Sequence, residues 1–151
     1  MTRMWLKGDA SFMTDTPREI AEMAVLHEIA NTLSISSNVK DFAYKAFELL
    51  EKKLGMTHGT LRLFNPSTNE ITTEIAYGMT EEAKRRGKYK LGEGVTGKVV
   101  EAGEPAIIPR IDEDPLFLNK TRARGDITRK NISFICVPIK LGADVMGALS
   151  I

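Results

Sequence analysis

The sequence has one cysteine and two histidines among its 151 residues. A single thiol cannot form an intrachain disulfide, and so few cysteines and histidines argue against a metal site built from them. The 21 basic and 20 acidic side chains nearly cancel, which argues against a dedicated nucleic-acid or membrane-surface binder. No apolar run approaches the roughly 20 residues of a membrane span, and no signal-peptide pattern is present. These absences predict a cytoplasmic protein without a metal ion or cofactor.

The remaining composition is that of one ordinary globular domain, with 42% hydrophobic and 27% charged residues. Residues 1–15 show no sustained period, and we expect them to form a flexible N-terminal arm. Residues 16–151 are then the folded domain, which is long enough to bury a core. The final apolar segment stops in the middle of a strand pattern, so a C-terminal helix and any output domains are expected to be absent.

Two helices are predicted to open the domain. Thr16 and Glu19 form a capping-box pattern, and the helix that they start should end near Ser34. Asn38 is a favourable N-cap for the second helix. The apolar residues that follow recur in steps of three and four, and Gly55 suits the left-handed position that ends such a helix.

Strands are predicted for the rest of the chain, because the hydrophobic period shortens after Gly55. We expect them at residues 57–64, 71–77, 88–91, 106–109, 132–139 and 145–151, with short helices at 81–86 and after Gly94. The hairpin spacing implies mainly antiparallel pairing, so the fold class is α+β.

The first helix carries an apolar seam at helical spacing: Ile20, Met23, Leu26, Ala30 and Leu33. A seam of this kind packs either on the outer face of the sheet or against a second protomer. The sequence leaves both alternatives open.

A glycine-rich stretch runs from Gly92 to Gly97 and fits the G-x-G-x-x-G pattern of dinucleotide sites. It also nearly fits a phosphate-binding loop, but Val99 stands where Ser or Thr would hold magnesium. We therefore interpret the glycines as a turn that lets a helix approach the sheet. Amides at the start of that helix still make Gly94 and Thr96 candidates for contact with a ligand anion.

No catalytic arrangement is evident. Cys136 lies within an apolar strand, where a cysteine usually packs as a small hydrophobe. His27 and His58 lack the neighbours of a metal site. The acidic run 112–114 has no partner group at the spacing that acid–base chemistry needs. The sequence therefore predicts a protein that is not an enzyme.

The long segment 110–130 has no strong period and is rich in basic residues. Arginine presents a planar fork that matches carboxylates and phosphates. Arg110, Arg122 and Arg124 are therefore candidate ligand-binding residues, together with the apolar Phe117. The alternative interpretation is a loop with scattered solvated charge.

Several local patterns, taken in order, resemble those of GAF domains. They are Ile75 to Gly78, Leu91 to Val100, Gly103 to Ile108, Asp114-Pro115 followed by Phe117, Ser133 to Ile139, and Val145 to Leu149. Residues 89–100, 109–119 and 132–139 are most similar to the N-terminal GAF domain of Nif-specific regulatory proteins. The resemblance implies a central antiparallel sheet with N-terminal helices on one face, and loops and a short helix on the other.

The resemblance also implies a function. Such a domain is expected to be the sensory part of a nitrogen-fixation transcriptional activator, controlling an attached ATPase and a DNA-binding output without contacting nucleic acid itself. It would bind a 2-oxoglutarate-like anionic metabolite, a PII-type signalling protein, or both, and form a homodimer. The alternative is an interaction and dimerisation module, without a ligand, of another signalling protein such as a sensor kinase or phosphotransferase regulator.

Overall fold

A computed structural model describes residues 17–123 and 131–151. The helices of this part of the chain are α1 (Pro17–Ile35), α2 (Val39–Leu54), α3 (Glu81–Arg86) and α4 (Gly94–Ala102). The strands are β1 (Thr60–Asn65), β2 (Glu70–Ala76), β3 (Tyr89–Lys90), β4 (Ala106–Ile108), β5 (Phe134–Leu141) and β6 (Asp144–Ser150). They form one antiparallel sheet in the order β3-β2-β1-β6-β5-β4. The predicted α+β class is confirmed.

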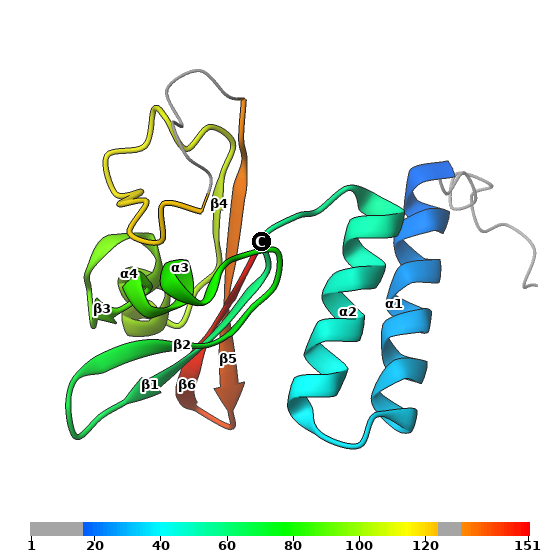
Figure 1. The fold of residues 1–151 in the computed structure, drawn as a ribbon, viewed down its shortest axis with the longest axis horizontal. Coiled ribbons are helices and arrows are strands. Elements are labelled where there is room, and N and C mark those ends of the chain that lie inside the picture. The colour runs from blue at the N-terminus through cyan, green and yellow to red at the C-terminus, as the bar shows by residue number, and fades with distance from the viewer. Residues whose placement is uncertain (1–16, 124–130) are drawn as a thin grey trace, which may run out of the picture.

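The sheet separates two layers of different kind (Figure 1). Helix α2 lies on one side of the sheet, and α1 packs on α2 farther out. Helices α3 and α4 and the segment after β4 lie on the other side. This is the predicted layering of helices on one face, and loops with a short helix on the other.

Helix α2 begins and ends where the sequence places its boundaries. The Asn38 side chain accepts a hydrogen bond from the Asp41 amide at 2.9 Å, and Gly55 adopts the left-handed conformation with φ of 68°. Lys52 and Lys53 lie in the last turn, where positive charge interacts favourably with the negative end of the helix dipole. Local chemistry therefore fixes both ends. The Thr16 cap predicted for α1 lies outside the described residues.

Two apolar clusters hold the layers together. On the α2 side, Phe47 and Ile75 are buried, and Phe47 stacks on Tyr77 with ring centres 5.9 Å apart. On the other side a larger cluster joins α4 to β2, β3, β5 and β6 and contains the fully buried Cys136 and Ile111. The sheet thus has a covered apolar surface on each face.

The predicted bounds of two strands were wrong. Strand β1 starts at Thr60, not at residue 57, because His58 has a left-handed φ of 60° that interrupts extended structure. Strand β5 starts at Phe134 and runs to Leu141, whereas the prediction was 132–139. The Ile132 carbonyl instead accepts from the Ile111 amide at 3.0 Å and ties the long loop to the sheet.

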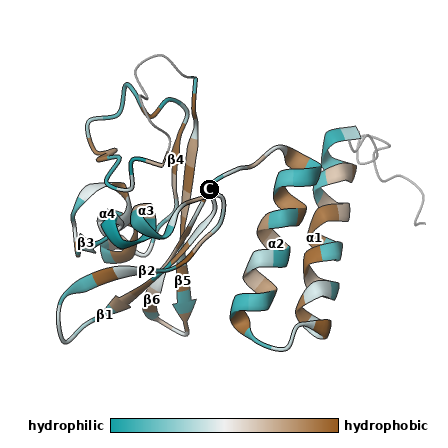
Figure 2. Cartoon of the chain, viewed as in Figure 1, coloured by the Kyte–Doolittle hydropathy of each residue, from teal (hydrophilic) through white to brown (hydrophobic). Residues whose placement is uncertain are grey.

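The apolar seam of α1 does not pack on the sheet. Among the α1 residues only Val25 is buried, while Met23, Leu26 and Leu33 are 60–67% exposed. The apolar residues appear as brown bands along α1 in Figure 2. Of the two predicted alternatives, packing of the seam on the outer face of the sheet is therefore excluded for this structure. Within the described chain, no helix has the length and apolarity to cross a membrane.

Candidate functional site

Arg62 is a charged residue in the interior of the domain, with 3% of its surface exposed. It lies in the middle of β1, where alternation points it to the same side as Thr60, toward α4. Its Nη1 donates to the Thr60 hydroxyl at 2.6 Å and to the Ser150 hydroxyl at 2.8 Å. The two hydroxyls also bond to each other at 2.6 Å. Neighbouring strands therefore hold one edge of the guanidinium in a fixed position.

The positive charge of Arg62 has no counter-charge within the described residues. No carboxylate there forms an ion pair with it, and its buried Nε has no hydrogen-bond partner. Burial lowers the pKa of the Arg62 guanidinium, yet arginine still stays protonated in proteins. A buried cation of this kind is costly unless an anion compensates it.

The guanidinium lines a small cavity beneath the segment that follows β4. The cavity has a volume of about 20 Å³, which is room for about one water molecule. Its walls come from β1, β3, α4, β5 and the loop, namely Arg62, Tyr89, Val95, Thr96, Leu116, Phe117, Leu118, Asn119, Thr121 and Phe134. The cavity combines apolar walls with one buried positive charge.

Aromatic rings form much of this wall. The Arg62 guanidinium lies 5.2 Å from the centre of the Tyr89 ring, and the Lys120 ammonium lies 4.9 Å from the same centre. Both are within cation–π range. Phe117 meets Phe134 edge to face with ring centres 5.1 Å apart. Tyr89, Phe117 and Phe134 are the aromatic residues among those that line the cavity.

The glycine-rich turn before α4 brings the helix against the sheet, as the sequence predicted. A Cβ atom at Gly97 would lie 2.4 Å from the Lys90 carbonyl oxygen, so only glycine allows this approach. The Val95 amide donates to the Leu116 carbonyl at 3.2 Å. The helix start therefore binds the chain's own loop.

The structure separates the ligand-binding candidates of the sequence into two groups. Thr96 and Phe117 line the cavity, and Gly94 lies directly beneath Leu116 and Leu118. Arg110 lies elsewhere on the loop, where it forms ion pairs with Asp112 at 2.8 Å and with Glu113 at 2.9 Å. Arg122 is exposed, and Arg124 lies outside the described residues.

Arg62 was missed by the sequence reasoning, although the sequence contains a signal for it. Arg62 stands between Leu61 and Leu63 in a strand pattern. Strand alternation places Arg62 on the same face as Thr60 and Phe64, opposite to the face that carries Leu61 and Leu63. A charge on a strand face that another layer covers needs a partner, and that requirement could have marked Arg62 as a candidate.

The cysteine and the acidic residues 112 and 114 are engaged in packing, ion pairs or backbone hydrogen bonds. Burial raises the pKa of the Cys136 thiol to about 11, which leaves it unreactive at neutral pH. The Arg110 guanidinium lowers the pKa of Asp112, and Asp114 accepts from the Leu116 amide at 2.8 Å. Within the described ranges, no three side chains of metal-ligating type come together.

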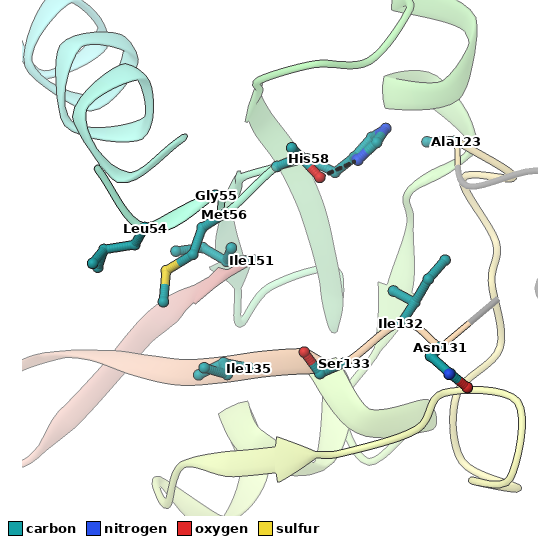
Figure 3. A pocket seen from close by; sticks show the side chains of 11 residues that line it. Leu54, Gly55, Met56, His58, Ala123, Asn131, Ile132, Ser133, Ile135 and Ile151 are labelled. Atoms are coloured by element: carbon teal, nitrogen blue, oxygen red, sulfur yellow. Dashed lines mark hydrogen bonds between the residues drawn. The ribbon is translucent and has the colours of Figure 1, made fainter. Parts of the chain in front are cut away.

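A second, wider hollow of about 450 Å³ lies between the end of α2, the start of β5 and Ile151 (Figure 3). His58 lies on its rim, and its Nδ1 is 3.0 Å from the Thr57 hydroxyl. Ile135 and Ile151 form an apolar part of its wall. This hollow lacks a buried charge, so the Arg62 cavity is the stronger candidate for a specific ligand.

The fold is an antiparallel sheet with helices on one face and, on the other, short helices and a loop that cover a small cavity. The chain belongs to the GAF domain family, whose model matches residues 36–151.

Its relatives include nitrogen fixation proteins and Nif-specific regulatory proteins. The chain is 33% identical to the nitrogen fixation protein VnfA of Azotobacter vinelandii over 129 residues, which are 85% of this chain and 25% of that protein. It is 32% identical to the Nif-specific regulatory protein of Azospirillum lipoferum over 130 residues, 86% of this chain and 21% of that protein. The predicted resemblance is confirmed. The chain spans only about a quarter of these relatives.

Solved structures share the fold. The GAF domain of A. aeolicus nlh2 in an inactive state superposes with a TM-score of 0.74 at 27% identity, covering 87% of this chain and 78% of that one. A free methionine-R-sulfoxide reductase from Neisseria meningitidis superposes with a TM-score of 0.72 at 15% identity, covering 91% of this chain and 75% of that one. At that identity the second likeness shows the fold alone.

Proposed function

We propose that this domain is the sensory part of a nitrogen-fixation transcriptional activator and binds a small carboxylate at Arg62. The observation that carries the proposal is the buried guanidinium without a counter-charge. The domain has no catalysis of its own. It acts by shifting the equilibrium of an attached ATPase and DNA-binding output, as the similarity to Nif-specific regulatory proteins suggests.

A carboxylate suits this position for chemical reasons. Its two oxygens match the planar donor fork of arginine, and Nε of Arg62 has no other partner. Thr96 adds a hydroxyl to the wall and Phe117 an apolar surface. We propose Arg122, Arg124 and Arg110 as further cations that attract an anion at long range. The contribution of Arg110 is expected to be small, because Asp112 and Glu113 pair with it.

The test is calorimetric titration of the folded domain with 2-oxoglutarate, followed by acetate and succinate. We expect saturable heat with at least one of these carboxylates and none with a neutral amide such as acetamide. No heat at millimolar concentrations of all three carboxylates, with the domain verified as folded by circular dichroism, would remove the small-carboxylate proposal.

A second observation favours association of the domain with another copy of itself. The exposed α1 seam is apolar, whereas α1 buries only Val25 in the isolated chain. Such faces are typical of helices that pair. We propose a homodimer through α1, and a PII-type signalling protein as a further partner of the activator in the cytoplasm. A domain that only dimerises and binds partners remains the second candidate function.

The dimer is tested by sedimentation at micromolar concentrations. Leu26→Glu places a charge in the seam, where the side chain is 67% exposed, so we expect the variant to sediment as a monomer with an unchanged fold. Leu141→Glu is the matched control, because Leu141 is 72% exposed outside the helices. A monomeric unmodified domain at high micromolar concentration contradicts the proposal.

A further inference from the structure

The cavity at Arg62 is closed by the segment 116–122, which we call the lid. Leu116, Phe117, Leu118, Asn119 and Thr121 of the lid line the cavity. Its volume of about 20 Å³ does not accommodate an organic carboxylate. A ligand that reaches Arg62 must therefore displace the lid, and the contacts of the lid decide how easily this happens.

Besides the packing of Phe117 on Phe134, polar contacts hold the lid. Lys120 Nζ forms an ion pair with Glu93 and donates to the Lys88 carbonyl at 3.0 Å. Arg86 Nη2 donates to the Thr121 carbonyl at 2.8 Å. At the other end of the lid, the Val95 amide donates to Leu116. Lys120 is therefore the lid side chain that ties the segment to the glycine-rich turn.

Glu93 is held in position to receive Lys120. It occupies the N-cap position of α4, but its side chain makes no capping hydrogen bond. Its Oε2 instead accepts from the Lys90 amide at 2.8 Å, which leaves Oε1 directed at Lys120. The ion pair lowers the pKa of Glu93, so the carboxylate stays ionised at neutral pH. One carboxylate thus joins β3 to the lid.

The backbone on both sides of the contact is in an unfavourable conformation. Asn119 has φ of 43° and Arg122 has φ of 52°. A left-handed conformation is uncommon for residues other than glycine and is costlier for arginine than for asparagine. The closed lid therefore depends on its contacts to hold this conformation.

We propose that the ion pair between Lys120 and Glu93 is a clasp that keeps the lid closed over Arg62, so that Glu93 controls the access of an anion to the cavity. Glu93 is a positioning residue in this scheme, because it acts through Lys120. When the clasp opens, the Lys120 ammonium loses its carboxylate partner, and the lid loses its ion pair with the glycine-rich turn. The inference rests on the proposed function for its ligand, but lid opening is measurable without any ligand.

The experiment compares hydrogen exchange of the lid amides in the unmodified domain and in Glu93→Gln. The ion-pair side chains are 30% and 35% exposed, so we expect lid exchange to be roughly twofold to fivefold faster in the variant. Exchange in β5 and β6 should not change. High salt should speed lid exchange in the unmodified domain and leave the variant unaffected.

Asp41→Asn is the matched control, because it removes the ion pair with Lys45 on α2, whose N–O distance is 2.8 Å, and should leave lid exchange unchanged. Lid exchange in Glu93→Gln that equals the unmodified rate overturns the clasp. A rise of the same size in β5 and β6 also overturns it, because Glu93 would then act on global stability.

A titration with 2-oxoglutarate, acetate and succinate separates this inference from the proposed function. If the clasp holds the lid, Glu93→Gln should bind the responsive carboxylate about twofold to fivefold more tightly. Unchanged or weaker binding by the variant overturns the control of access by Glu93. If neither protein binds any of the three, the carboxylate proposal fails, and the exchange rates alone decide whether the clasp exists.

Discussion

Replacing Arg62 by methionine is expected to weaken carboxylate binding tenfold or more without destabilising the domain. The substitution removes the buried guanidinium and keeps a side chain of similar length. Loss of a hydrogen-bonded charged partner weakens binding by about 1.5–3 kcal/mol, roughly tenfold to hundredfold in Kd. The measurement is calorimetric titration of Arg62→Met with the carboxylate that binds the unmodified domain.

The stability of the same variant is the sharper part of this prediction. A buried charge without a counter-ion costs free energy, and an apolar residue of similar volume does not. The Thr60 and Ser150 hydroxyls keep each other as partners at 2.6 Å. We therefore expect the free energy of unfolding of Arg62→Met to equal or exceed that of the unmodified domain.

Arg110→Met is the control, because Arg110 is half exposed and already neutralised by Asp112 and Glu113. It should bind carboxylates within about twofold of the unmodified domain. If Arg110→Met abolishes binding and Arg62→Met does not, the ligand is held by the loop that the sequence indicated, and the cavity is not the site.

Phe47→Ala is expected to have the largest effect on stability. Phe47 is 2% exposed and joins α2 to the sheet. A Cβ atom at Gly59 would lie 2.2 Å from the Phe47 ring, so the backbone of Gly59 packs directly on the ring. Loss of a buried phenylalanine costs about 3–5 kcal/mol, a large share of the roughly 5–15 kcal/mol of a typical domain.

Urea unfolding measures this effect, with Val39→Ala as the control on the same helix. Val39 is 68% exposed, and its truncation should change the free energy of unfolding by no more than about 0.5 kcal/mol. A cost below about 1 kcal/mol for Phe47→Ala would mean that α2 is not anchored to the sheet through this ring.

Much of the fold was predictable because its signals are local. Asn38 begins α2 through a capping hydrogen bond, and Gly55 ends it through a left-handed backbone conformation. Both features depend only on immediate neighbours in the sequence. Alternating apolar residues predicted β2 nearly to its observed ends. The order of the glycine, proline and strand patterns also indicated the family.

The early boundary predicted for β1 shows where local reasoning fails. Residues 57–59 continue the strand pattern, but His58 turns the chain with a left-handed φ of 60°. The packing of Gly59 on Phe47 explains why the chain passes so close to α2 here. A contact between α2 and the segment after it is not visible in the period of either one.

The sequence by itself determined the α+β class, the two N-terminal helices, the antiparallel strands and the GAF family, since each depends on periods and motifs within short stretches. Only the tertiary structure decided which charge is buried. Arg62 is one of 21 basic residues, and its solvation depends on Tyr89, Thr96, Phe117 and Ser150, which lie far from it in sequence. The exposure of the apolar α1 residues Met23, Leu26 and Leu33 was likewise decided by the tertiary structure. Burial and counter-charge result from contacts between distant segments, and no local pattern encodes them.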